Sequence, residues 1–99
     1  MSRAITTRLE AAISLAESVA WYNGRAPGLG NDLLDELKAN YVMIKDYPQG
    51  FRETAAGIRQ CPLKRFPYVI LYHVEALEIL VLAVFHTSRD LNKKGTVDA

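Results

Sequence analysis

Apolar residues recur with helical spacing in two stretches of the first half of the chain, and the first stretch spans residues 9–23. Its apolar stripe consists of Leu9, Ile13, Ala16 and Ala20. Residues three or four positions apart lie on one face of a helix, so the stripe predicts an amphipathic helix. Thr7 followed by Glu10 fits a capping box at its start, and Asn23-Gly24 predicts its end.

The second helical stretch follows a tight connection, Ala26-Pro27-Gly28-Leu29-Gly30, and Asn31 is a candidate cap for it. Its stripe consists of Leu33, Leu37, Tyr41 and Ile44, with Leu34 beside it. Tyr47-Pro48-Gln49-Gly50 ends the pattern. Two amphipathic helices joined by so short a connection predict an antiparallel helical hairpin.

The second half of the chain is rich in β-branched and aromatic residues, which predicts strands. The expected strands are Gly57–Leu63, Phe66–Val74 and Leu77–His86, with a further short strand at Ser2–Thr6. Pro62 cannot donate a ladder hydrogen bond, so its strand should lie at an edge or carry a bulge. We therefore expect an α+β fold of order β-α-α-β-β-β, in which a short N-terminal strand and the helical hairpin pack on a C-terminal antiparallel sheet.

Both faces of the last two expected strands are apolar. Strict alternation groups Tyr68, Ile70, Tyr72 and Val74 on one face of one strand, and Leu77, Ile79, Val81, Ala83 and Phe85 on one face of the other. Their opposite faces carry Val69, Leu71 and His73, and Leu80, Leu82 and Val84. Two helices can cover only one face, which favours a partner chain or a second copy on the other. The alternative is that the C-terminal tail and residues 48–57 fold over it.

Composition agrees with one small domain over residues 1–99, with a flexible tail from about residue 91. Hydrophobic residues make up 49% of the chain, and no apolar run approaches the roughly 18 residues needed to span a membrane. The single cysteine, Cys61, excludes an internal disulfide, and nothing predicts a metal or other cofactor. A cytoplasmic protein is expected. The net charge of +1 is low for a protein that binds nucleic acid through phosphates.

The candidate chemistry is limited to one histidine and several cations near strand ends. An RNA-cleaving site needs a proton donor and acceptor and cations for the developing phosphate charge. The candidates are His86, Arg59, Lys64, Arg65 and Arg89. No second histidine or tyrosine follows to share proton transfer with His86, which favours a structural hydrogen bond there. The basic side chains could equally solvate an edge strand or form a patch for phosphate or an acidic partner.

Four stretches in this order resemble the RelE/ParE superfamily of bacterial toxins, over about residues 4–90. They are Trp21-Tyr22 with Pro27-Gly28-Leu29-Gly30, Asp46-Tyr47-Pro48, Arg65-Phe66-Pro67-Tyr68 with Tyr72, and Leu82-Ala83-Val84-Phe85-His86 leading to Arg89-Asp90. The first and third resemble the ParE-like, plasmid-stabilisation branch more closely. The ending departs from the family's Arg-Asp-Pro, since this chain has Arg89-Asp90-Leu91.

The resemblance implies the toxin of a type II toxin–antitoxin system, bound and neutralised by a cognate antitoxin in a hetero-oligomer. It implies inhibition of DNA gyrase by protein–protein contact, without a catalytic centre. The candidate antitoxin contacts are Trp21, Leu34, Tyr41, Tyr68, Leu71 and Leu82. The alternatives are a RelE-like endonuclease that cuts mRNA on the ribosome, using the His86 set, and a family member that binds a partner without being toxic.

Overall fold

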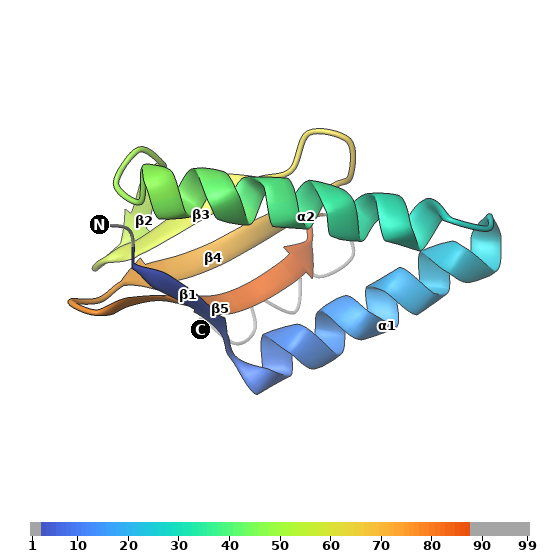
Figure 1. Ribbon diagram of the computed structural model, residues 1–99, viewed down its shortest axis with the longest axis horizontal. Helices are drawn as coiled ribbons and strands as arrows, with labels where there is room; N and C mark the ends of the chain where they lie inside the picture. The colour runs from blue at the N-terminus through green and yellow to red at the C-terminus, as the bar shows by residue number, and fades with distance from the viewer. Residues whose placement is uncertain (1–2, 88–99) are drawn as a thin grey trace.

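Two helices lie over one face of a five-stranded sheet in the computed structural model, which describes residues 3–87 (Figure 1). The elements are β1 (Ala4–Thr7), α1 (Leu9–Arg25), α2 (Leu29–Asp46), β2 (Glu53–Ala55), β3 (Ile58–Pro62), β4 (Tyr68–Val74) and β5 (Glu78–His86). The α+β class and the order of the predicted elements are confirmed. The sequence pattern did not predict β2, whose three residues are all exposed.

The sheet has the strand order β1-β5-β4-β3-β2, so β4 is its central strand. The predicted antiparallel pairing holds for β3, β4 and β5, and the additional strand β2 also pairs antiparallel with β3. β1 runs parallel to β5 and makes the sheet mixed. β2 is so short that it covers only the beginning of β3. Pro62 lies at the far end of β3, beyond this partner, so its missing N–H leaves no ladder bond unmade there.

A bulge in β5 changes which of its residues face the helices. Leu71 of β4 pairs with Ala83, whereas the next residue, Tyr72, pairs with Val81, so Leu82 is an extra residue in the ladder. Side chains alternate strictly only while the register is kept. Val84 is consequently buried together with Ile79 and Val81, and the predicted grouping of these last two with Ala83 and Phe85 is wrong.

The core lies between α2 and the helix-facing side of the sheet. Its buried members are Leu33, Leu37, Ile44, Cys61, Leu63, Phe66, Tyr68, Ile70, Tyr72, Ile79, Val81 and Val84. The predicted stripe of α2 thus supplies three core residues, and the fourth, Tyr41, packs against them partly buried. Its hydroxyl shares a 2.9 Å hydrogen bond with Thr7 Oγ1, which ties α2 to the end of β1.

α1 packs through a different face from the one that its sequence pattern indicated. The residues that turn inward are Ala11, Leu15, Val19 and Tyr22. The predicted stripe points outward instead, with Leu9 72% and Ile13 50% exposed and both alanines exposed. Both sets have helical spacing. The set that packs against the sheet is the one with the bulkier residues, Leu15, Val19 and Tyr22.

The helix ends also differ from their predictions. Thr7 is the last residue of β1 rather than a cap, and the residue before α1, Arg8, makes no capping hydrogen bond with its side chain. α1 continues through Gly24 to Arg25. The left-handed residue is Gly28 (φ 85°), after which α2 begins at Leu29, so Asn31 lies inside the helix.

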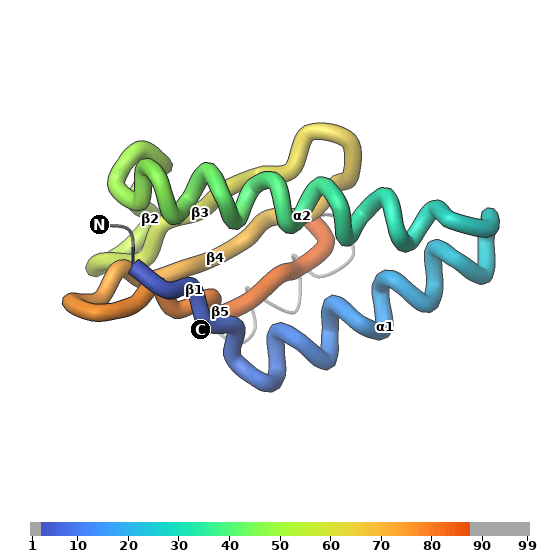
Figure 2. The backbone as a smooth tube through the Cα atoms, in the orientation of Figure 1, coloured from blue at the N-terminus to red at the C-terminus, as the bar shows by residue number. Residues whose placement is uncertain are grey.

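Asn23 closes the turn between the two helices. Its side-chain oxygen accepts the backbone N–H of Gly30 at 2.8 Å, which satisfies one of the free donors in the first turn of α2. Figure 2 shows the helices close together at this turn and diverging toward the other end of the sheet. The close approach depends on Gly30, because a Cβ built there would overlap the Val19 carbonyl oxygen of α1.

Gly30→Ala should therefore lower the free energy of unfolding by about 1–3 kcal/mol, since the clashing atom belongs to the backbone and cannot rotate away. Gly24→Ala is the matched control: a Cβ at this helical position meets nothing within 4 Å, and the change should stabilise by up to about 1 kcal/mol. Urea unfolding of both variants measures the difference. Equal stability of the two variants would contradict a close helix contact at Gly30.

Candidate functional site

The turn between β3 and β4 is held against α2 by the carboxylate of Glu36. This carboxylate accepts the backbone N–H groups of Lys64 and Arg65, the latter at 3.1 Å. Charged acceptors make the stronger hydrogen bonds, so the turn has a fixed position although it is exposed. The Arg65 guanidinium also lies 3.6 Å from Asp32 of α2. Both cationic side chains remain on the surface.

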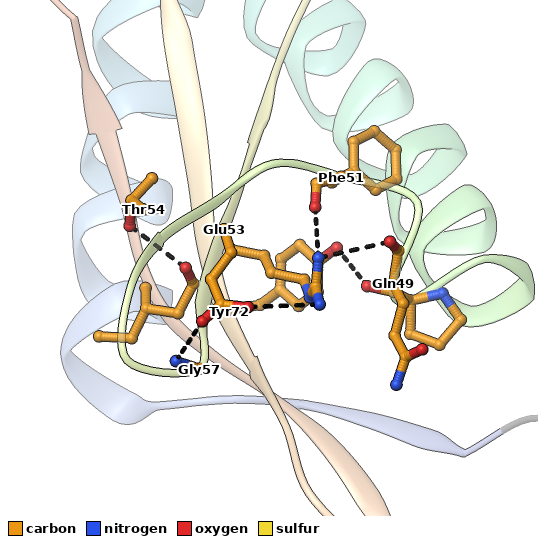
Figure 3. Close-up of polar contacts among 9 residues, drawn as sticks. Gln49, Phe51, Glu53, Thr54, Gly57 and Tyr72 are labelled. Atoms are coloured by element: carbon orange, nitrogen blue, oxygen red, sulfur yellow. Dashed lines mark hydrogen bonds and ion pairs between the residues drawn. The ribbon is translucent and has the colours of Figure 1, made fainter.

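Arg59, from the same predicted catalytic set, lies elsewhere and contacts Gln49, Phe51 and Glu53, which are labelled in Figure 3. Its guanidinium donates hydrogen bonds to the carbonyl oxygens of Phe51 at 2.7 Å and Gln49 at 3.3 Å, and it pairs with Glu53 at 3.5 Å. The Glu53 carboxylate in turn accepts the backbone N–H of Gly57. Arg59 therefore stabilises the segment between α2 and β3.

The sheet register separates Arg59 from His86. Arg59 pairs with Tyr72, whereas His86 pairs with Tyr68. Four residues of strand separate these two positions of β4, which corresponds to about 13 Å. The structure thus brings Lys64, Arg65 and His86 to one end of the sheet and places Arg59 toward the other. Arg89 lies outside the described residues.

Burial raises the pKa of two groups in the sheet, the Tyr72 hydroxyl and the Cys61 thiol. Burial raises the pKa of Tyr72 to about 12, and its hydroxyl donates a 2.7 Å hydrogen bond to the Pro48 carbonyl. Burial, together with the nearby Glu36 charge, raises the pKa of the Cys61 thiol to about 11. A thiol with so high a pKa stays protonated at neutral pH and is a poor nucleophile. Its Sγ donates to the Asn40 side-chain oxygen at 3.3 Å.

His86 ends β5 against an aromatic ring. The centroids of its ring and that of Tyr68 lie 5.2 Å apart in an edge-on arrangement. Tyr68 also faces Tyr22 of α1 at 6.2 Å, and Tyr22 faces Phe66 at 5.2 Å. The histidine is therefore one end of a series of rings that connects α1 with the sheet.

The predicted antitoxin contacts occupy three different environments. Trp21 is 45% exposed on α1, and Leu34 and Tyr41 of α2 are partly buried against the core. Tyr68 is fully buried, so it offers no surface in this chain alone. Leu71 and Leu82 are partly buried, as are Leu80 and Phe85. A partner chain on the second face of the sheet stays a prediction.

The outward face of α1 is an exposed apolar surface that sequence reasoning did not assign as a site. We call it the α1 stripe, and it consists of Leu9, Ile13, Ala16 and Ala20. A helix that is apolar on two sides normally has both sides covered. The signal was available in the sequence, because Leu15, Val19 and Tyr22 form a second apolar set. Sequence reasoning also missed Glu36, because the residues whose backbone N–H groups its carboxylate accepts lie 28 and 29 positions further along the chain.

Residues 3–87 contain no group of three or more histidine, cysteine, aspartate or glutamate side chains that could hold a metal ion. Within the same range, no helix combines the length and apolar character that crossing a membrane requires.

Fold and site together define a small α+β protein in which a helical hairpin covers one face of a mixed sheet and presents an exposed apolar stripe. A family model described as "ParE toxin of type II toxin-antitoxin system, parDE" matches residues 7–91. The chain therefore belongs to the family of ParE toxins of type II toxin–antitoxin systems, which confirms the resemblance seen in the sequence.

A solved structure has the same fold. It is described as "Chromosomal ParDE TA system from P. aeruginosa", and it superposes with a TM-score of 0.75 over 86% of this chain and 96% of that chain. The sequence identity is 18%, so the likeness is one of fold. A search of the curated proteins found no match.

The raised pKa values predict alkaline sensitivity. A group whose pKa is raised by folding contributes stability that is complete below its unfolded-state pKa and is lost as the pH rises toward the folded-state value. For Cys61 that window runs from 9.0 to about 11, and for Tyr72 from 10.0 to about 12. The free energy of unfolding should therefore fall between these limits, by at most about 1.4 kcal/mol per pH unit for each group.

Tyr72→Phe should lower stability at neutral pH by about 1–3 kcal/mol, because the Pro48 carbonyl loses its donor, and should flatten the fall above pH 10. Tyr47→Phe is the control, since that ring is largely exposed and should keep the wild-type pH dependence. Chemical unfolding at a series of pH values gives both quantities. An alkaline fall as steep in the Tyr72 variant as in the wild type would refute the assignment.

Proposed function

We propose that this protein is a toxin that inhibits DNA gyrase by protein–protein contact in the cytoplasm and is neutralised by a cognate antitoxin. The observation that carries the proposal is the match to the ParE toxin family over residues 7–91. The ParE-like stretches of the sequence support it, above all Trp21-Tyr22 and Arg65-Phe66-Pro67-Tyr68.

The geometry supports contact rather than bond cleavage as the mode of action. A nuclease of the predicted kind would gather His86 with its cations around one phosphate. Arg59 is instead bound to two carbonyl oxygens and a carboxylate, toward the other end of the sheet from His86. Of the members of the predicted set that the structure describes, Lys64 and Arg65 share the end of the sheet with His86.

The α1 stripe supports the antitoxin part of the proposal. Leu9 and Ile13, followed on the same face by Ala16 and Ala20, leave an exposed apolar row on α1, and such a row fits the apolar face of a partner helix. Covering it would remove apolar area from water, the main source of stability in protein association. The antitoxin, as the permanent partner of a type II toxin, is the protein proposed to occupy it.

Induced expression without antitoxin should arrest growth with filamentation and a DNA-damage response while translation continues. Purified toxin should inhibit supercoiling by gyrase in vitro, and His86→Ala should do so equally well, because contact rather than proton transfer is proposed. Co-expressed antitoxin should abolish the arrest. Rapid loss of protein synthesis with cleaved transcripts, prevented by His86→Ala, would instead establish a ribosome-dependent endonuclease.

Replacing Leu9 and Ile13 together by serine should weaken antitoxin binding by at least about tenfold, since two exposed apolar side chains leave the proposed interface. Leu77→Ser is the control, because Leu77 is more exposed than either but lies in the link between β4 and β5. Isothermal titration with the purified antitoxin measures both. Unchanged affinity of the double variant would show that the antitoxin binds elsewhere.

A further inference from the structure

An aromatic cluster with cations at its rim occupies the end of the molecule where α1, α2 and the β3–β4 turn meet. We call it the Trp21 cluster. It consists of the rings of Trp21, Tyr22, Phe66 and Tyr68 and the cations Arg25, Lys64 and Arg65. Successive ring centroids lie 4.9 to 6.2 Å apart, within the range of favourable edge-to-face contacts.

The base of this cluster is rigid and its rim is exposed. Phe66 and Tyr68 are buried in the core, and Tyr22 lies between them and the surface. At the rim, Trp21 is almost half exposed and the Arg25 guanidinium lies 4.5 Å from the centre of its ring. Side chains held from below lose little freedom when a partner binds them, which favours affinity.

The composition of the rim is that of a protein-binding hot spot. Tryptophan, tyrosine and arginine are the residues most enriched among those that dominate interface energies. Arg65 adds a second cation over a ring, 5.5 Å from the centre of Phe66.

Glu36 positions the third cation of the rim. By binding the backbone N–H groups of the β3–β4 turn, its carboxylate fixes the place from which Lys64 projects. Among residues 3–87, the Lys64 ammonium has neither an ion pair nor a hydrogen bond. It is thus available to a carboxylate brought by a partner.

The charge balance favours a protein over a nucleic acid. Asp32 pairs with Arg65, and Glu36 binds the backbone N–H groups of Lys64 and Arg65, so two carboxylates accompany the three cations and the local excess is small. The whole chain carries only +1. Affinity for nucleic acid depends on many cations that neutralise phosphates, and nearby carboxylates oppose it.

We propose that the Trp21 cluster is the surface with which this toxin binds its target, and that it accepts a protein segment presenting a carboxylate beside an apolar or aromatic side chain. The carboxylate meets Lys64 and Arg65, and the apolar side chain lies against Trp21. This inference rests on the proposed function, because it takes the toxin to act by contact with a protein.

Three variants test it: Trp21→Ala, Lys64→Glu with Arg65→Glu, and, as control, Lys38→Glu with Arg52→Glu, which reverses two exposed cations outside the cluster. Each is purified with its antitoxin and assayed for antitoxin affinity, for gyrase inhibition after the antitoxin is removed, and for growth arrest on induction. We expect the first two to lose at least about tenfold in gyrase inhibition and to stop arresting growth. The Lys64→Glu with Arg65→Glu variant should keep the antitoxin affinity of the control, which also shows that it folds. Because Trp21 is a candidate antitoxin contact, the fold of Trp21→Ala is checked by circular dichroism instead.

The outcomes separate this inference from the proposed function. If the wild type arrests growth without inhibiting gyrase, and only the cluster variants lose the arrest, gyrase is excluded and the inference stands for another protein target. Wild-type activity in the cluster variants overturns the inference and leaves the gyrase proposal intact. If the Lys64→Glu with Arg65→Glu variant loses antitoxin affinity and keeps its activity, the cluster binds the antitoxin and the inference is wrong. If the wild type neither inhibits gyrase nor arrests growth, both the proposed function and the role of the Trp21 cluster are wrong.

A fluorescent single-stranded DNA oligonucleotide serves as the probe for the other class of partner. The inference expects weak binding to it that is equal in the wild type and the cluster variants. Strong binding by the wild type that the cluster variants alone lose would overturn a protein-binding role.

Discussion

The central strand of the sheet buries two tyrosines, Tyr68 and Tyr72, and the arrangement at each end of the sheet follows from their burial. A phenol hydroxyl removed from water needs a hydrogen-bond partner, and no buried side-chain nitrogen or oxygen among the described residues lacks one. Tyr72 reaches the Pro48 carbonyl and thereby holds the chain after α2 within reach of Arg59. Tyr68 supports Tyr22 and His86 with its ring and so joins α1 to the end of β5.

The elements that could be predicted are those with a clear pattern of apolar residues, either a helical stripe or a continuous run. α2 has one apolar stripe, and β4 and β5 are apolar runs between breakers, so their type and approximate limits followed from the sequence. β2 could not be predicted, because its three exposed residues owe their conformation to pairing with β3. The bulge at Leu82 was equally hidden, since a change of register depends on two strands and leaves no periodic signal in either.

The candidate site was predicted in part for a similar reason. Lys64, Arg65 and His86 meet because the β3–β4 turn and the end of β5 lie at one end of a simple meander. Arg59 was placed with them by its closeness in sequence, although strand pairing carries it toward the other end. Glu36 could not have been found from local patterns, because the carboxylate binds a turn far along the chain. Contacts between distant segments are the information that periodicity lacks.

α1 shows why a misread face can point to function. Two apolar sets compete for the sheet, and only one of them, with Leu15 and Val19, can be buried within the chain. A protein that worked alone would be expected to carry polar residues on the other side, since exposed apolar rows favour association. Here the α1 stripe runs from Leu9 to Ala20, and its two large side chains, Leu9 and Ile13, lie at least about 12 Å from Trp21 along the same helix. The proposed antitoxin and target surfaces can therefore belong to one helix and still be altered independently, which a single shared patch would not allow.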